Sequence, residues 1–129
     1  MSVMNRTIVH SKKAPAPIGP YSQAVMINDT LYVSGQIAID QDSGNLLTSN
    51  IEIETEQVMK NIGYILEEAG LDYSHVVKCS IFVSDMNNFQ MINAIYGKYF
   101  LQNPPARETV EVRRLPKDVN VEISCIAIK

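Results

Sequence analysis

Apolar and polar positions alternate along two short stretches near the start of the chain, and this alternation predicts two β-strands. The stretches are residues 22–28 and 31–39, and residues 28–30 between them have the composition of a tight turn. In the second strand, the period of two places Gly35 on the same face as Leu31. A glycine inside a strand either marks a bulge or lets another group approach the backbone closely.

Two helices are predicted where apolar residues recur at a spacing of three to four. The first covers residues 50–69, and Ser49 and Glu52 at its start have the spacing of a capping box. The second covers residues 86–101. Asp85 is expected to cap its first turn, and the prolines that follow the segment prevent its continuation.

Three more strands are predicted from short runs rich in β-branched residues, over 76–83, 107–114 and 119–128. The resulting order is β-β-α-β-α-β-β. Two helices suffice to cover one face of a mixed sheet, so we expect an α+β two-layer sandwich. In the strand over 107–114, Val110 is expected to point away from the side of the sheet on which Arg107 lies.

The other face of this sheet has no helix left to cover it. We expect it to carry Ile126 and Ile128 beside Arg107 and Glu122. Because such a mixture is neither dry nor fully solvent-like, we predict that this face packs against another copy of the chain, as a homo-oligomer.

Composition narrows the class of protein. A chain of 129 residues, 46% hydrophobic and 19% charged, fits one globular domain over residues 1–129. Its net charge of −3 argues against a nucleic-acid partner. Residues 1–10 lack the apolar core of a secretory signal, and no apolar run approaches the length of a membrane span. We therefore expect a cytoplasmic protein with no membrane partner.

Metal and thiol chemistry are not expected. The two cysteines and two histidines are too scattered for a structural metal site. Cys125 shares its parity with the apolar residues of its strand, and we expect it and Cys79 to be buried free thiols in a reducing compartment.

A few polar residues stand at unusual positions. Arg107 begins a strand directly after Asn-Pro-Pro-Ala, and a guanidinium suits a carboxylate ligand, although a solvated strand-end arginine has the same pattern. Glu122 lies between apolar neighbours, where it either positions water or forms an exposed ion pair. Asn93 borders the apolar stripe of the second helix, as a structural bridge or a site residue. Tyr21 follows a stiff proline-rich arm, and Gly35 follows Ser34 within a strand.

Several motifs follow one another along the chain. They are IGPYSQA at 18–24, VSGQI at 33–37, NAIY at 93–96, PARETVEV at 105–112, LPKD at 115–118 and VEI at 121–123. In this order they resemble the motifs of the Rid/YjgF family of reactive-intermediate (enamine/imine) deaminases, and the resemblance runs from about residue 12 to 128.

The resemblance implies a chorismate-mutase-like fold and a homotrimer with sites between subunits. It implies that Arg107 holds the substrate carboxylate and that Glu122 contacts the water or the imine nitrogen. It also implies that the remaining substrate-binding positions are Tyr21, Ser34, Gly35, Asn93 and Thr109. Thr109 stands where many members carry a cysteine, so thiol chemistry is not expected to be needed.

The function that the resemblance implies is hydrolysis of 2-iminobutanoate and 2-iminopropanoate to 2-oxo acids and ammonia, without a metal or other cofactor. Three alternatives remain open at this point. The same cleft suits a regulatory trimer that only binds small carboxylates. An RNA-directed translation inhibitor or endoribonuclease is disfavoured by the acidic charge. A chaperone-like role has no specific feature in its favour.

Overall fold

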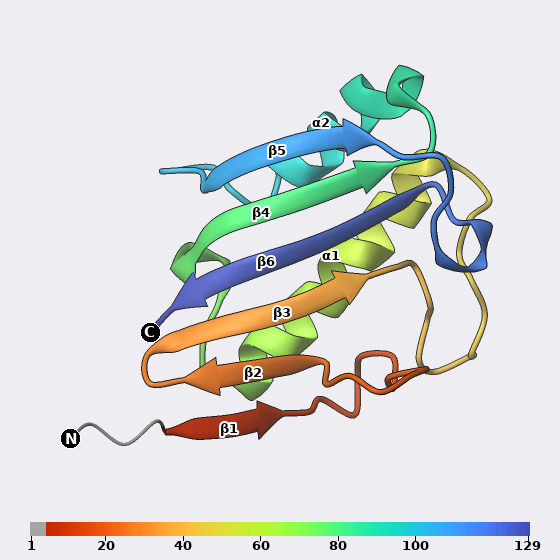
Figure 1. The fold of residues 1–129 in the computed structure, drawn as a ribbon. Helices are drawn as coiled ribbons and strands as arrows, with labels where there is room; N and C mark the ends of the chain where they lie inside the picture. The colour runs from red at the N-terminus through yellow and green to blue at the C-terminus, as the bar shows by residue number, and fades with distance from the viewer. Residues whose placement is uncertain (1–4) are drawn as a thin grey trace.

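The computed structural model describes residues 5–129. Figure 1 shows the strands as one sheet with the helices behind it. The strands are β1 (Arg6–Val9), β2 (Ala24–Ile27), β3 (Thr30–Gln36), β4 (Val76–Val83), β5 (Ala106–Glu111) and β6 (Val121–Ile128). The helices are α1 (Ile51–Glu68) and α2 (Phe89–Gly97), and three 3-10 turns lie at Tyr73–His75, Met86–Asn88 and Pro116–Asp118. No secretory signal is expected over residues 1–10, and of these, residues 1–4 lie outside the described residues.

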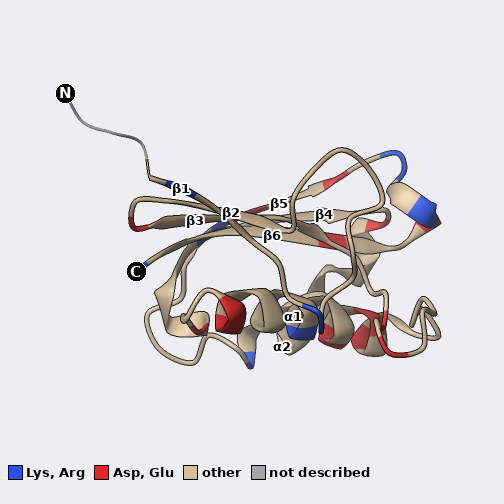
Figure 2. Cartoon of the chain, turned by 90° about the horizontal axis from the view of Figure 1, so that it is seen from below, with Lys and Arg blue, Asp and Glu red and all other residues tan. Residues whose placement is uncertain are grey.

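The strands form one mixed sheet in the order β1-β2-β3-β6-β4-β5. Only β4 and β5 run parallel, and the other neighbouring pairs are antiparallel. Both helices lie against the same side of the sheet, as Figure 2 shows. The predicted α+β two-layer sandwich is therefore confirmed. We call the covered side the helix face and the other side the open face.

The core lies between α1 and the central strands. Val58, Ile62 and Ile65 of α1 are fully buried at helical spacing, and Ile81 of β4 and Ile123 of β6 are buried beneath this layer. Burying apolar side chains of this size contributes roughly 1.5–3 kcal/mol each, before the opposing chain entropy. The apolar residues that recur at helical spacing in α1 thus pack against the alternate apolar residues of the strands.

The ends of the helices differ from the prediction. Asn50, rather than Ser49, is the N-cap of α1, and its side-chain oxygen accepts a hydrogen bond from the backbone N–H of Ile53 at 2.8 Å. Asp85 caps the 3-10 turn over Met86–Asn88, and α2 is shorter than the predicted 86–101 segment. Gly97 ends α2, in agreement with the low helix propensity of glycine.

Two further differences concern the strands. The sequence analysis did not identify β1, because its four residues are too few to show a period. The register between β3 and β6 shifts between Val33 and Gln36, so both of these residues are buried although they are three positions apart. The prediction that Gly35 shares the face of Leu31 is therefore wrong, since this β-bulge turns Gly35 toward the open face.

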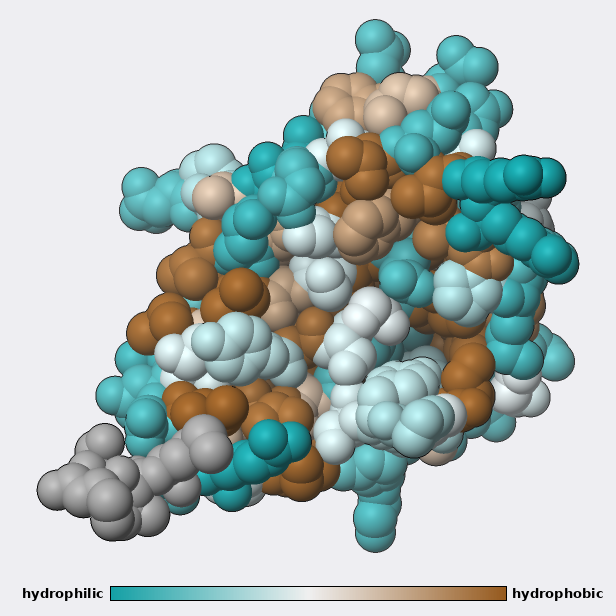
Figure 3. All heavy atoms as spheres, in the orientation of Figure 1, coloured by the Kyte–Doolittle hydropathy of each residue, from teal (hydrophilic) through white to brown (hydrophobic). Residues whose placement is uncertain are grey.

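The open face is partly apolar. Figure 3 shows brown apolar atoms between teal and white polar ones on this side. Tyr32 is 48% exposed, and Val110 and Ile128 are each 40% exposed. No helix within residues 5–129 is long and apolar enough to cross a membrane.

Candidate functional site

The predicted site residues lie on two different faces of the sheet. Arg107 of β5 lies opposite Cys79 of β4, and Cys79 is buried on the helix face. Glu122 of β6 lies opposite Phe82 of β4, which has the reverse parity and belongs to the open face. Directly opposed residues on neighbouring strands point to the same side of a sheet. Arg107 and Glu122 of one chain therefore point away from each other.

This finding corrects the prediction that Arg107 shares the open face with Glu122. The alternation along β5 was predicted correctly, but not which side faces the helices. Val110 lies on the open face and is 40% exposed, although an apolar residue was expected to face the helix layer. Because β5 is an edge strand, its arginine can lie beside α2 and still remain partly exposed.

Three residues of α2 surround the guanidinium of Arg107. Its Nη1 donates a hydrogen bond to Oδ1 of Asn93 at 2.5 Å. The guanidinium carbon lies 5.5 Å from the ring centre of Phe89 and 5.2 Å from that of Tyr96, within the range of cation–π attraction. A guanidinium has five N–H donors, so the bond to Asn93 leaves others available to a ligand.

A layer of less exposed groups lies beneath this arginine. Cys79 and Cys125 are buried free thiols that face each other across β4 and β6. Burial raises the pKa of both thiols, although the positive charge of Arg107 acts in the opposite direction on the pKa of Cys79. Since a thiolate is the reactive form, neither cysteine has the environment of a nucleophile.

The hydroxyl of Thr109 lies on the same side of β5 as Arg107. Its Oγ1 is buried and has no hydrogen-bond partner within residues 5–129, and the same holds for the Tyr96 hydroxyl. Thr109 is therefore next to the arginine along the strand, but its side-chain oxygen is not exposed on the surface of a single chain.

Glu122 lies across Gly35 on the open face. A Cβ atom on Gly35 would be 2.6 Å from Oε1 of Glu122, so a larger residue at this position would displace the carboxylate. Partial burial raises the pKa of Glu122, and none of the described residues forms a salt bridge or hydrogen bond with it. A carboxylate with a raised pKa and free lone pairs is suited to accept or return a proton.

The proline-rich arm brings Tyr21 to the region of Ser34 and Gly35 on β3. The buried Gln23 holds this arm in place. Its side-chain amide donates hydrogen bonds to the carbonyl oxygens of Ser11, Ala14 and Pro15 at 3.0, 3.3 and 2.9 Å. The arm and β3 enclose a small cavity of about 20 Å³ whose lining includes Tyr21 and Gly35.

Two further hydrogen bonds fix residues beside this cavity. Ser34 Oγ donates to the carbonyl oxygen of Ser22 at 2.6 Å. The Tyr21 hydroxyl accepts a hydrogen bond from the backbone N–H of Ile18 at 3.3 Å, and its ring is 47% exposed. Tyr21, Ser34, Gly35 and Glu122 therefore form one group, separate from the group of Arg107, Asn93 and Thr109.

Sequence analysis missed a residue that fixes the start of β6. Glu54 is completely buried, and its carboxylate accepts hydrogen bonds from the backbone N–H of Asn120 at 2.7 Å, from Asn120 Nδ2 at 2.8 Å and from the Val121 N–H at 3.2 Å. The available signal was a charged residue four positions before Val58, on the apolar stripe of α1. Glu54 thereby anchors the backbone just before Glu122.

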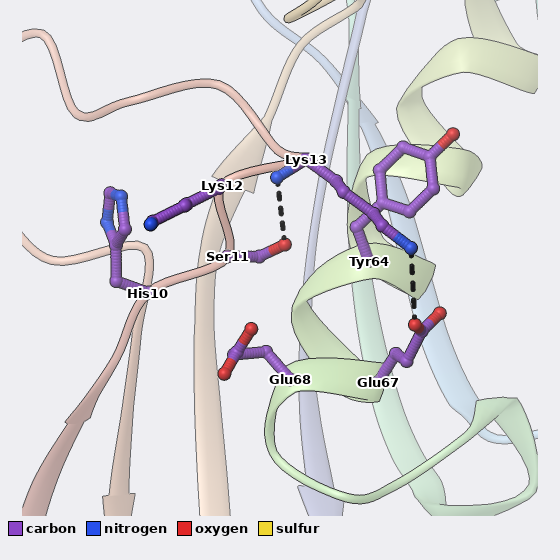
Figure 4. Close-up of a pocket in the computed structure, with 7 residues that line it drawn as sticks. All are labelled: His10, Ser11, Lys12, Lys13, Tyr64, Glu67 and Glu68. Carbon is purple, nitrogen blue, oxygen red and sulfur yellow. Dashed lines mark hydrogen bonds and ion pairs between the residues drawn. The ribbon is translucent and has the colours of Figure 1, made fainter.

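A larger hollow of about 360 Å³ lies elsewhere, between the N-terminal arm and α1. Figure 4 shows Lys13 reaching over Tyr64 to Glu67, with which it forms a salt bridge of 3.4 Å. None of the predicted site residues lines this hollow. Within residues 5–129, no three His, Cys, Asp or Glu side chains gather as a metal ion would require.

The family model described as endoribonuclease L-PSP matches residues 11–129. The chain belongs to this family. The resemblance to Rid/YjgF proteins is thereby confirmed, because a solved structure of the Rid family protein YyfA from Yersinia pestis is 46% identical, with a TM-score of 0.94, over 97% of this chain and 100% of that one.

Two curated relatives extend the comparison of this L-PSP family member. A RutC family protein of Synechocystis, slr0709, is 47% identical over 97% of this chain and 98% of its own length. The human 2-iminobutanoate/2-iminopropanoate deaminase is 44% identical over 100% of this chain and 94% of its own length.

Proposed function

We propose that this protein is a hydrolytic deaminase of small 2-imino acids, such as 2-iminobutanoate and 2-iminopropanoate. The observation that carries the proposal is the guanidinium of Arg107, fixed by Asn93 with free donors remaining. The 44% identity with the human deaminase over the whole chain supports this substrate class.

Arg107 is the anchor for the substrate carboxylate. A planar guanidinium binds a carboxylate through two parallel hydrogen bonds, which fixes both position and orientation. A 2-imino acid carries its carboxylate next to the electrophilic C=N carbon. Binding at Arg107 therefore holds that carbon in one place.

Glu122 is the group that positions water. Its carboxylate accepts a proton from the water that adds to C2 of the protonated imine, which gives a tetrahedral intermediate with hydroxyl and amino groups on that carbon. The proton on Glu122 then passes to the amino nitrogen. The C–N bond breaks and ammonia leaves as the C=O bond forms, and the hydroxyl proton returns to the Glu122 carboxylate. The products are 2-oxobutanoate or pyruvate and ammonia, and no cofactor is consumed.

This reaction makes a modest demand on the protein. Imines already hydrolyse readily in water, so positioned acid–base groups that supply a gain of roughly 10²–10⁴-fold are sufficient. An activated nucleophile or a metal ion is not needed.

A second copy of the chain completes the site. Because Arg107 and Glu122 lie on opposite faces, a cleft that holds both takes one residue from each of two protomers. Such a contact joins two different surfaces, and it closes into a ring when the rotation between copies allows. We propose the homotrimer expected for this family, in which β5 and α2 of one protomer meet the open face of the next.

The test is a coupled assay with threonine dehydratase, which generates 2-iminobutanoate, and with semicarbazide, which traps the imine that is not hydrolysed. The wild-type protein is expected to reduce semicarbazone formation. Arg107→Ala is expected to have no effect, whereas Arg6→Ala, at the opposite edge of the sheet, serves as a matched control that acts like wild type. No effect from the wild-type protein would refute the proposal.

The geometry also favours a second candidate function, a regulatory trimer that binds small carboxylates without turnover. A single chain already holds Arg107 in place for a carboxylate, whereas Glu122 lies elsewhere. Calorimetry that detects binding of 2-oxobutanoate, together with an inactive coupled assay, would select this function over the deaminase.

A further inference from the structure

We infer that Phe89 and Tyr96 are positioning residues for Arg107, which hold the plane of its guanidinium so that a carboxylate meets the correct edge. The inference deepens the proposed function and rests on its assignment of Arg107 as the carboxylate anchor. It assigns a role to two aromatic side chains that no step of the proposed reaction uses.

We call the three α2 residues that contact Arg107, which are Phe89, Asn93 and Tyr96, the clamp. Their spacing along the helix brings them together. Positions 89, 93 and 96 are four and three residues apart, so they share one side of the helix. All three contact the same guanidinium, with ring centres at 5.5 and 5.2 Å and the Asn93 oxygen at 2.5 Å. Both rings lie within cation–π range of the guanidinium, and the hydrogen bond to the amide oxygen holds one of its nitrogen atoms.

The position of Phe89 argues that this contact is more than core packing. Among the residues of α2, the buried ones are Ile92, Ile95 and Tyr96, and Phe89 remains partly exposed at the first turn. It is also absent from the hydrophobic cluster beneath α1 and α2. An aromatic side chain that adds little to the core, yet lies within 5.5 Å of the guanidinium carbon, is best explained by that contact.

Tyr96 acts through its ring. Its hydroxyl is buried without a hydrogen-bond partner in the described part of the chain, so it forms no hydrogen bond with Arg107. The matched pair of variants is therefore Tyr96→Phe, which keeps the ring, and Tyr96→Leu, which removes it.

An unclamped arginine has many rotamers, and a ligand must order them on binding. The clamp removes much of this disorder in advance. Loss of one ring is therefore expected to weaken binding of a carboxylate, with 2-oxobutanoate as the probe, by about three- to tenfold.

The experiment measures rotation of the Arg107 guanidinium about its Cζ–Nε bond, by NMR on protein labelled with carbon-13 and nitrogen-15 arginine. Loss of one signal in Arg107→Lys assigns the residue. In the wild type without ligand, Arg107 is expected to rotate more slowly than the exposed Arg6. Phe89→Leu and Tyr96→Leu are expected to speed this rotation about fivefold, and Tyr96→Phe to keep it slow.

A variant that keeps an aromatic ring distinguishes a loss of positioning from a loss of folding. Phe89→Tyr keeps a ring at this position and is expected to show the slow rotation and the 2-oxobutanoate binding of the wild type. Rotation of Arg107 that is as fast as that of Arg6 in the wild type, or unchanged in Phe89→Leu, would overturn the inference. Because this readout needs no imine, a slow guanidinium in a protein that hydrolyses no imine refutes the proposed function and leaves the clamp established.

Discussion

Glu122 lies on the open face above Gly35, and its surroundings decide when it carries a charge. Partial burial raises the pKa of this carboxyl above the ordinary glutamate value of 4.5. The proton is therefore retained up to a higher pH than on an exposed glutamate. In the proposed reaction the ionised form accepts the proton of water, so activity falls as the pH decreases through the raised pKa.

The pH profile of catalysed imine hydrolysis tests this role, after subtraction of the spontaneous rate. We expect the wild type to show an acidic limb whose midpoint lies above pH 4.5, the ordinary pKa. Glu122→Gln has no carboxyl to titrate and is expected to lose this limb along with about 10²-fold or more of the rate. A limb that persists unchanged in Glu122→Gln would assign the titration to another group.

At the scale of the elements, the contact between α1 and β6 depends on a buried carboxylate. Glu54 accepts three hydrogen bonds from the backbone and side chain of Asn120 and the backbone of Val121. Removal of the acceptor leaves these buried and partly buried donors without their protein partner. Each such donor costs roughly 1–3 kcal/mol.

Glu54→Ala is therefore expected to lower the free energy of unfolding by at least about 3 kcal/mol. Glu68→Ala, an exposed glutamate near the end of the same helix, is the control and is expected to change it by less than about 0.5 kcal/mol. Urea unfolding at one fixed protein concentration measures both, because association of copies also contributes to stability. Equal effects of the two substitutions would contradict the anchoring role.

The elements also show what the sequence predicts and what it does not. The 3.6-residue period predicts α1 well, and both alternatives for Gly35, a bulge or a close approach, are found, because it lies in a β-bulge and beneath Glu122. Alternation along β5 could not reveal which parity faces α2, because that depends on the register with β4. The hydrogen bonds of Glu54 to Asn120 span 66 residues, and no local pattern encodes such a contact.

At the scale of the whole molecule, the sheet separates Arg107 from Glu122. In the proposed trimer, each site then takes these residues from different protomers. Two inactive variants that each lack one residue are expected to complement each other when their subunits are mixed. With random assembly of equal amounts, about a quarter of the sites contain both native residues.

Mixing Arg107→Ala and Glu122→Gln chains, followed by unfolding and refolding together, tests this expectation. We expect the mixture to recover up to about a quarter of the wild-type activity in the coupled assay. Each variant refolded alone is the control and is expected to stay inactive. A mixture as inactive as its components would show that one chain supplies both residues to a site.

The labelling rate of the two cysteines reports how often the sheet opens. They face each other on β4 and β6, two interior strands of the sheet, and are only 1% and 4% exposed. A thiol-specific dye must reach a solvated, ionised sulfur, which neither position offers in the folded chain. The labelling rate of both thiols is therefore set by how often the middle of the sheet opens, and it measures the free energy of that opening without any added probe residue.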